Sequence, residues 1–128
     1  MKSWDTIRQE CPKLYKEGIA FECAHGWYDI VYDLSVKIEK ILNEYAENHK
    51  RVEGEENEIF EMFAVQVKEK YGTLRFYMSL ETDEISDLIH EAEALSSQTC
   101  ESCGASAKMR GTRWFEVKCD ACFASNRN

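Results

Sequence analysis

The clearest pattern of apolar positions in the chain begins directly after Gly26. Apolar side chains recur there at steps of three and four residues: Trp27, Ile30, Val31, Leu34, Ile38, Ile41, Leu42 and Tyr45. Charged side chains fall between them: Asp33, Lys37, Lys40 and Glu44. This spacing gathers the apolar residues on one face of a helix. It predicts a long amphipathic helix from about Trp27 to about Asn48.

A period of two replaces the helical period after residue 60. In a first run Phe63, Val65 and Val67 alternate with Ala64, Gln66 and Lys68, and in a second Leu74, Phe76, Met78 and Leu80 alternate with Arg75 and Tyr77. Such alternation is typical of strands with one buried face. Tyr71 and Gly72 separate the runs, and glycine readily adopts the positive φ of a tight turn. The pattern predicts a β-hairpin.

Shorter signals complete the predicted fold. Residues 3–17 indicate one or two short helical turns, interrupted or restarted at Pro12 and ended by Gly18, and residues 19–23 indicate a short strand. Thr82 or Asp83 can cap a second helix. Its apolar stripe is Ile85, Leu88, Ile89, Ala92 and Leu95. The charged stretch HKRVEGEENE reads as a loop, and the whole predicts an α+β fold with helices packed on a small antiparallel sheet.

Two Cys-x-x-Cys pairs follow the second helix. They are Cys100 with Cys103 and Cys119 with Cys122, and fifteen residues lie between the pairs. This spacing is typical of a four-cysteine zinc site. A gap of two residues lets both thiolates of a pair reach one ion, and Gly104 eases the turn after the first pair. Two disulfides, or four free thiols, are the alternatives.

The segment between the pairs predicts a C-terminal zinc ribbon. Residues 113–118 read as its returning strand, and we expect Trp114 and Phe115 to cover the zinc thiolates and pack on the rest of the protein. Four thiolates complete a tetrahedral shell and leave no position open for water. The zinc is therefore predicted to be structural, and the protein to be no enzyme.

Known catalytic patterns are missing from the sequence. A base deaminase needs His-x-Glu ahead of Pro-Cys-x-x-Cys, whereas Ala92 stands two residues after His90 and neither cysteine pair follows a proline. The sequence has no glycine-rich phosphate loop and no Gly-x-Ser-x-Gly elbow. Cys11 and Cys23 are expected to be buried structural thiols. An enzyme acting through dispersed carboxylates stays an alternative.

The length of the chain and its expected compartment bear on the number of domains and on the state of the cysteines. A chain of 128 residues fits one domain and can bury a core without cross-links; we divide it into an acidic body, residues 1–98, and a zinc-ribbon module, residues 99–128. Neither a signal peptide nor an apolar run of membrane-spanning length is visible, so we expect a cytoplasmic protein without membrane contact. Cytoplasmic thiols stay reduced, which favours metal ligands over disulfides.

Charge indicates the kind of partner. The chain has 16 basic and 24 acidic residues, a net charge of −8. Residues 100–128 hold five basic and three acidic residues, net +2, so residues 1–99 carry −10. Nucleic-acid binders draw affinity from cations that displace phosphate counterions, and this body would repel a duplex. A basic protein partner is the better expectation, since an acidic field speeds its association.

Two groups of residues are candidate partner contacts. Four carboxylates belong to the charged loop: Glu53, Glu55, Glu56 and Glu58. Tyr28 and Tyr32 lie one helical turn apart beside the apolar stripe of the long helix, and tyrosine is enriched at interfaces. A second acidic set opens the last helix, where the helix dipole alone can account for it.

Four segments together resemble a family of small zinc-ribbon-containing proteins of bacteria and their phages: FECAHGWYDIVYDLSVKIEKI, AVQVKEKYGTLRFYMS, TCESCG and VKCDAC. The likeness covers roughly residues 12–122. It rests on a Gly-Trp-aromatic-acidic helix start, a hairpin ending in Leu-Arg-Phe-Tyr, and a terminal four-cysteine module. Gly72-Thr73 stands where many members have Gly-Gly, and CAHGW replaces the more usual Gly-Asp-Gly-Trp.

The resemblance implies a function. Similar proteins occur in prophage regions and, in some bacteria, beside secreted antibacterial toxins as immunity proteins. The expected function is therefore an immunity protein that occludes the basic active site of a toxin, with a nuclease as the expected target. The alternative is a phage-derived zinc-ribbon nucleic-acid adaptor that uses the residues Arg110, Arg113, Trp114 and Lys118.

Overall fold

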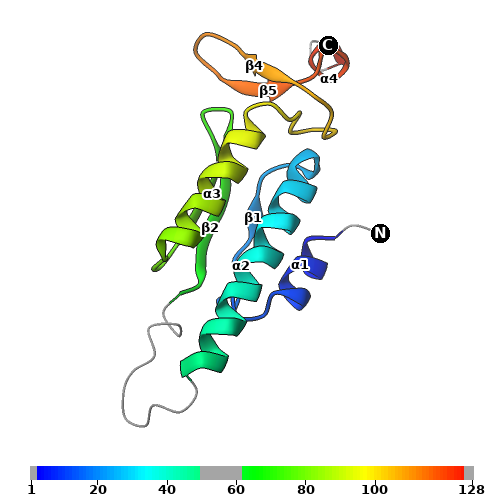
Figure 1. Cartoon of the computed structure of the whole chain (residues 1–128). Coiled ribbons are helices and arrows are strands. Elements are labelled where there is room, and N and C mark those ends of the chain that lie inside the picture. The colour runs from blue at the N-terminus through cyan, green and yellow to red at the C-terminus, as the bar shows by residue number, and fades with distance from the viewer. Residues whose placement is uncertain (1–2, 50–61, 126–128) are drawn as a thin grey trace.

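The computed structural model describes residues 3–49 and 62–125. Its helices are α1 (Trp4–Glu10), α2 (Tyr28–His49), α3 (Asp83–Ser96) and α4 (Asp120–Ser125), with a 3-10 turn η1 (His25–Trp27) before α2. Its strands are β1 (Phe21–Glu22), β2 (Ala64–Lys70), β3 (Thr73–Met78), β4 (Lys108–Arg110) and β5 (Glu116–Lys118). The fold is α+β as predicted (Figure 1). The returning strand predicted over residues 113–118 is shorter, since β5 covers Glu116–Lys118, and η1, β4 and α4 had no counterpart of their own among the predicted elements.

The main sheet has the order β1-β2-β3. β2 and β3 form the predicted antiparallel hairpin, in which Val67 faces Phe76 across the strands. β1 adds on the other side of β2 and runs parallel to it, with Phe21 opposite Val67, so the sheet is mixed. Helices α2 and α3 lie side by side along the sheet, α1 packs beside α2, and the β4–β5 ribbon sits at the end where α2 begins (Figure 1).

The hairpin turn forms at Tyr71-Gly72, where the sequence predicts it, and Tyr71 shares the positive φ expected of the glycine. Tyr71 and Gly72 both have positive φ, 54° and 87°, and they connect the paired residues Lys70 and Thr73. Positive φ at both central residues matches the twist of the flanking strands. The Glu69 carboxylate accepts a hydrogen bond from the Gly72 N–H at 2.7 Å, which holds the turn closed.

A shift of register corrects the predicted faces of β2. Ala64 and Val67 are both buried, while Val65 is 44% exposed. The ladder shifts between Ala64 and Gln66, and such an irregularity lets two residues of one strand oppose one of its partner. The prediction that Phe63, Val65 and Val67 share the buried face is therefore wrong. In β3 the alternation holds, since Leu74 and Phe76 are buried.

The outer edge of β3 is covered by side chains of α3. The Ser96 hydroxyl accepts from the Leu74 N–H at 2.9 Å, and the Glu93 carboxylate accepts from the Phe76 N–H at 3.1 Å. An uncovered edge presents unpaired backbone groups to other chains. Polar side chains of α3 thus accept the hydrogen bonds that a neighbouring strand would otherwise accept. These bonds hold the helix against the hairpin.

The apolar stripes of the two long helices supply the core. Trp27 is fully buried, and so is most of the stripe that follows it in α2. In α3 the buried apolar residues are Ile85, Ile89 and Ala92, whereas Leu95, predicted as part of the same stripe, is 53% exposed. The Thr82 side chain caps α3 by accepting from the Ile85 N–H at 3.2 Å, as predicted.

One buried carboxylate ties the N-terminal segment to α2. Glu39 is buried, and its two oxygens accept from the backbone N–H groups of Lys13, at 3.1 Å, and Leu14, at 2.9 Å. These donors follow Pro12, where the chain has left α1. The carboxylate replaces the backbone acceptors that a continuing helix would have provided.

Replacing Glu39 by alanine is expected to destabilise the protein by about 2–4 kcal/mol, because one buried and one partly buried N–H group lose their acceptors. Glu39→Gln keeps one acceptor oxygen and should recover part of that loss. Urea denaturation measures both. The exposed Glu44 on the same helix provides the control, and Glu44→Ala should change stability by less than about 0.5 kcal/mol. Equal effects at the two positions would contradict this role for Glu39.

Candidate metal centre

Each cysteine pair sits in a tight local structure. After α3 the chain enters a turn in which the Gly104 N–H donates to the Cys100 carbonyl at 2.8 Å and the Cys100 N–H donates to the Ala105 carbonyl at 2.7 Å. Gly104 has φ +85°, a conformation that suits glycine. The second pair lies where β5 gives way to α4: Cys119 follows the strand, and Cys122 stands within the helix.

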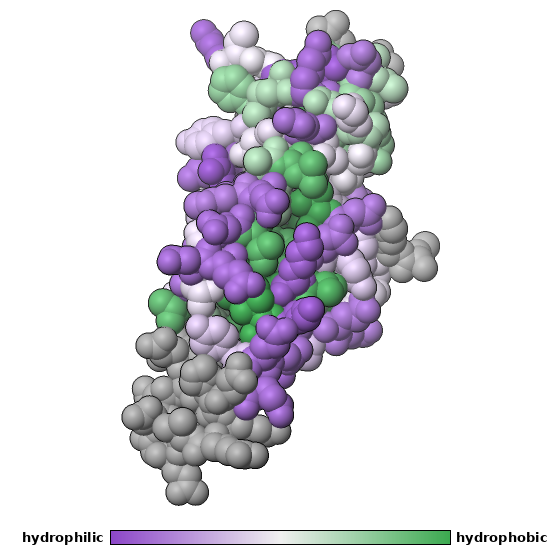
Figure 2. All heavy atoms as spheres, viewed as in Figure 1, coloured by the Kyte–Doolittle hydropathy of each residue, from purple (hydrophilic) through white to green (hydrophobic). Residues whose placement is uncertain are grey.

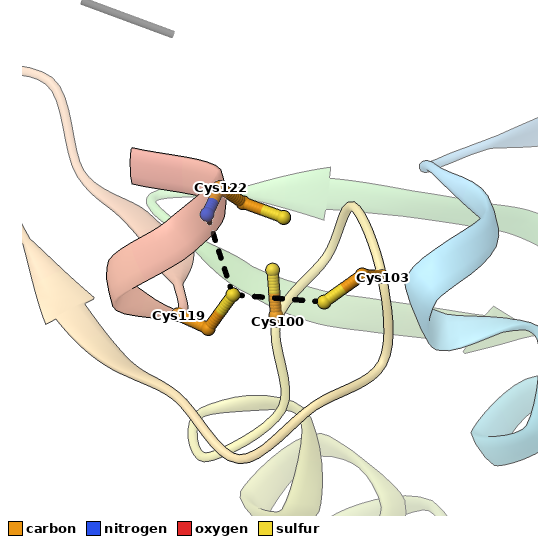
Figure 3. A group of neighbouring side chains, drawn as sticks. All are labelled: Cys100, Cys103, Cys119 and Cys122. Atoms are coloured by element: carbon orange, nitrogen blue, oxygen red, sulfur yellow. Dashed lines mark hydrogen bonds between the residues drawn. The ribbon is translucent and has the colours of Figure 1, made fainter. Parts of the chain in front are cut away.

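The structure brings the four predicted cysteines together. Their sulfur atoms all lie within 4.8 Å of one another, and Sγ of Cys103 is 3.6 Å from Sγ of Cys119. Figure 3 shows the four side chains converging from the first turn and from the start of α4. Tetrahedral thiolates at 2.3 Å from zinc are about 3.8 Å apart. A disulfide needs about 2.05 Å, and all four thiols are free, so the geometry fits a metal centre.

Backbone groups prepare this site for negative charge. Burial raises the thiol pKa of Cys100, but backbone N–H groups of Cys119, Cys103 and Ser102 outweigh it and lower that pKa to about 6. The thiols of Cys119, Cys103 and Cys100 have the opposite effect on Cys122 and raise its pKa to about 12. Four adjacent thiols cannot all ionise without a cation among them. A soft cation such as zinc meets that demand.

The first cysteine turn docks on the entrance to α2. The Gly26 N–H donates to the Glu101 carbonyl at 2.6 Å, the Ala24 N–H donates to the Glu101 carboxylate at 3.1 Å, and the Trp27 indole N–H donates to the Thr99 carbonyl at 2.8 Å. A Cβ on Gly26 would lie 2.1 Å from the Cys100 carbonyl oxygen. The Gly26-Trp27 pair of the sequence is thus explained by its contact with the cysteine turn.

The β2–β3 hairpin turn forms a second contact with the ribbon. A Cβ on Gly72 would lie 2.6 Å from the sulfur of Met109 and 3.1 Å from the backbone carbon of Phe115. The Glu101 N–H also donates to the Val117 carbonyl at 3.0 Å. The ribbon therefore contacts both the start of α2 and the tip of the β2–β3 hairpin, and the metal centre lies close to both junctions.

The predicted role of Trp114 is wrong. Its side chain is 78% exposed, and Phe115 is exposed as well, so neither covers the cysteines. Gly111, with φ +106°, approaches the Trp114 backbone so closely that a Cβ there would lie 1.9 Å from the Trp114 carbonyl oxygen. This tight loop joins β4 to β5 at the end of the ribbon away from α4 (Figure 1). Met109, itself 40% exposed, is the ribbon side chain that lies against Gly72 of the hairpin turn.

The two tyrosines predicted as partner contacts stack on each other in α2, with ring centroids 6.1 Å apart. Tyr28 is only 5% exposed, and its hydroxyl donates to the Ser3 carbonyl at 3.1 Å, so its prediction as a surface residue is corrected. Tyr32 is half-buried and donates to the Glu10 carboxylate at 3.1 Å. The four carboxylates of the predicted loop contact lie outside the described residues: Glu53, Glu55, Glu56 and Glu58.

Two cations of the alternative nucleic-acid surface are engaged inside the ribbon. Arg110 pairs with the Asp120 carboxylate at 2.5 Å and donates to the Lys118 carbonyl at 2.9 Å. Lys118 is buried and donates to the Ser102 hydroxyl. Arg113 and Trp114 stay exposed at the loop.

Comparisons with known proteins do not assign the chain to a family. No protein-family model matches the chain, and neither the curated proteins nor the solved structures contain a significant match. Among the helices in residues 3–49 and 62–125, none combines the length and the hydrophobicity needed to cross a membrane.

Proposed function

We propose that this protein is a non-enzymatic, zinc-stabilised inhibitor of a basic protein, of the kind that provides immunity to an antibacterial toxin. The four cysteines, Cys100, Cys103, Cys119 and Cys122, would hold Zn²⁺. Four thiolates fill its coordination shell, so the ion would act as a cross-link between the two turns. The negative body would then be the binding surface.

The acidic face of α3 carries this proposal. Asp83, Glu84, Asp87 and Glu91 are exposed, and α3 contains no lysine or arginine. The first two lie at the helix start, where the dipole stabilises them, but Asp87 and Glu91 lie beyond the first turn. Among the described residues no ion pair involving α3 is found: the pairs of Arg8 with Asp5 and of Arg110 with Asp120 both lie elsewhere. A basic partner would supply the missing countercharge.

Recovery of the partner tests the proposal. The tagged chain, expressed in its native cell, should retain a basic protein, and the purified chain should inhibit that protein's activity at equimolar concentration. A nuclease is the target class that we propose, because cation-lined clefts bind phosphate backbones. The association rate should fall by at least about tenfold between low and high salt. Recovery of nucleic acid without any basic protein would contradict the proposal.

The exposed Trp114 supports a second candidate function, a nucleic-acid adaptor. An exposed indole beside Arg113 can stack on an unpaired base, and such a stack contributes about 1–3 kcal/mol. Electrophoretic mobility shift of labelled single-stranded DNA and RNA distinguishes the two functions. The inhibitor hypothesis predicts no shift at moderate salt. The adaptor hypothesis predicts a shift that Trp114→Ala weakens at least fivefold.

A further inference from the structure

A groove runs between α2 and α3 on the face shown in Figure 2. Its volume is about 370 Å³, and its apolar lining comes from both helices: Ile30, Leu34, Leu88, Ala92 and Leu95. Figure 2, in the view of Figure 1, shows hydrophobic residues in a band between hydrophilic ridges over these helices. The apolar stripes of α2 and α3 therefore contact the core and also line this groove. Part of each stripe borders an open groove.

Two carboxylates and one lysine lie on the rims of this groove. Asp33 and Lys37 lie on the α2 side, and Glu91 lies on the α3 side. Asp87 precedes Glu91 by one helical turn, and like charges at that spacing destabilise a helix. This arrangement costs stability in the isolated chain, and a positively charged occupant would offset that cost.

We infer that the groove between α2 and α3 binds an amphipathic helix of a basic partner protein, an inference that rests on the proposed inhibitory function. The lining of α3 from Leu88 to Leu95 extends over eight residues, a rise of about 10 Å, so about two turns of a ligand helix would fill it. Apolar side chains at positions i, i+3 or i+4, and i+7 would enter the groove, flanked by lysine or arginine.

The charge of the chain selects this occupant over a second copy. Two copies would each bring a net charge of −8 and their acidic α3 face to the interface. Like charges placed opposite one another across an interface oppose association. A helix with basic flanks instead pairs with Asp87 and Glu91 while its apolar face covers Leu95, whose side chain is largely exposed in the free chain.

Peptide titration of the zinc-loaded, ¹⁵N-labelled full chain tests the inference. The probe is a synthetic helical peptide of about 14 residues, roughly 21 Å long, with a leucine stripe and lysine flanks. A matched peptide has the same stripe and glutamate flanks. The basic peptide should bind with a Kd below about 1 mM and shift amides of α2 and α3, and the acidic peptide should bind at least about tenfold more weakly.

Two single substitutions provide the variant and its control. Leu95→Lys places a charge in the groove at an exposed position and should weaken peptide binding at least about fivefold. Val65→Lys alters an equally apolar, exposed residue that does not line the groove, and it should leave the Kd within about twofold. Equal binding by the two variants, equal binding of the two peptides, shifts centred on the ribbon, or no binding below about 1 mM would each overturn the inference.

The same variants separate this inference from the proposed function. If a basic protein is recovered from the cell and inhibited, but Leu95→Lys leaves its Kd unchanged, the groove is the wrong surface and the inhibitory function stands. If the basic peptide occupies the groove but the chain recovers no basic protein, the groove stands as a helix-binding site and the inhibitory function is wrong.

Discussion

Replacing Cys103 by serine is expected to release the metal and to destabilise the protein by about 4 kcal/mol or more, because metal binding to such sites is coupled to folding. Serine keeps the size of the side chain but offers no thiolate. Without the metal, the Cys100–Gly104 turn loses its cross-link to α4, and its docking on Gly26 weakens with it. Metal analysis of the purified variant should find less than about 0.1 equivalents of zinc, and urea denaturation should report the loss of stability.

Cys23 provides the matched control for that substitution. It is a half-buried thiol outside the metal centre, and burial raises its pKa to about 12. Cys23→Ser should therefore retain one equivalent of zinc and lose less than about 1.5 kcal/mol of stability. A strong chelator should reproduce the Cys103→Ser phenotype in the unmodified chain. A Cys103→Ser protein that keeps its full zinc content would remove Cys103 from the ligand set.

Gly26→Ala is expected to separate the ribbon from the body and to destabilise the protein by about 3 kcal/mol. The added methyl group would lie 2.1 Å from the Cys100 carbonyl oxygen and 2.3 Å from that of Glu101. Both obstacles are backbone atoms, which cannot move aside as a flexible side chain can. The Gly26 N–H would lose its bond to Glu101, and hydrogen exchange at Gly26 and Trp27 should accelerate accordingly. Denaturation and amide exchange measure the two effects.

Gly18→Ala separates this steric effect from the general cost of replacing glycine. Gly18 has φ +61°, and a Cβ there meets no atom within 4 Å. Its substitution should cost about 1–2 kcal/mol through backbone strain alone and leave exchange at Gly26 unchanged. Similar losses of stability and similar exchange behaviour in both variants would show that Gly26 is not a contact between the ribbon and the body.

The elements with a regular period were predictable from the sequence. The three- and four-residue spacing predicted α2 within about two residues at each end, and Tyr71-Gly72 predicted the hairpin turn, because glycine readily adopts the positive φ of a tight turn. Cysteine spacing predicted which four residues meet, since two short loops can reach one ion only if their sulfurs converge.

The remaining features depend on contacts between distant segments. Nothing in the alternation of residues 63–68 indicates that the ladder shifts between Ala64 and Gln66, because the shift depends on the partner strand. Trp114 was predicted to cover the zinc thiolates and to pack on the rest of the protein, yet its side chain is 78% exposed at the loop between β4 and β5. The docking of Gly26 on Cys100 and Glu101 joins residues that no local pattern relates.

That docking has a consequence for the newborn chain. The Trp27 indole finds its acceptor 72 residues later in the sequence, and the Ala24 amide finds its partner 77 residues later. A ribosome adding about 5–20 residues per second needs roughly 4–14 s to synthesise the intervening segment. For that interval the Trp27 ring, fully buried in the folded protein, lacks its hydrogen-bond acceptor, and a shortage of the metal that joins the cysteine turns would prolong its exposure. The supply of metal would then determine which fraction of the newly synthesised chains folds before chaperones or proteases bind them.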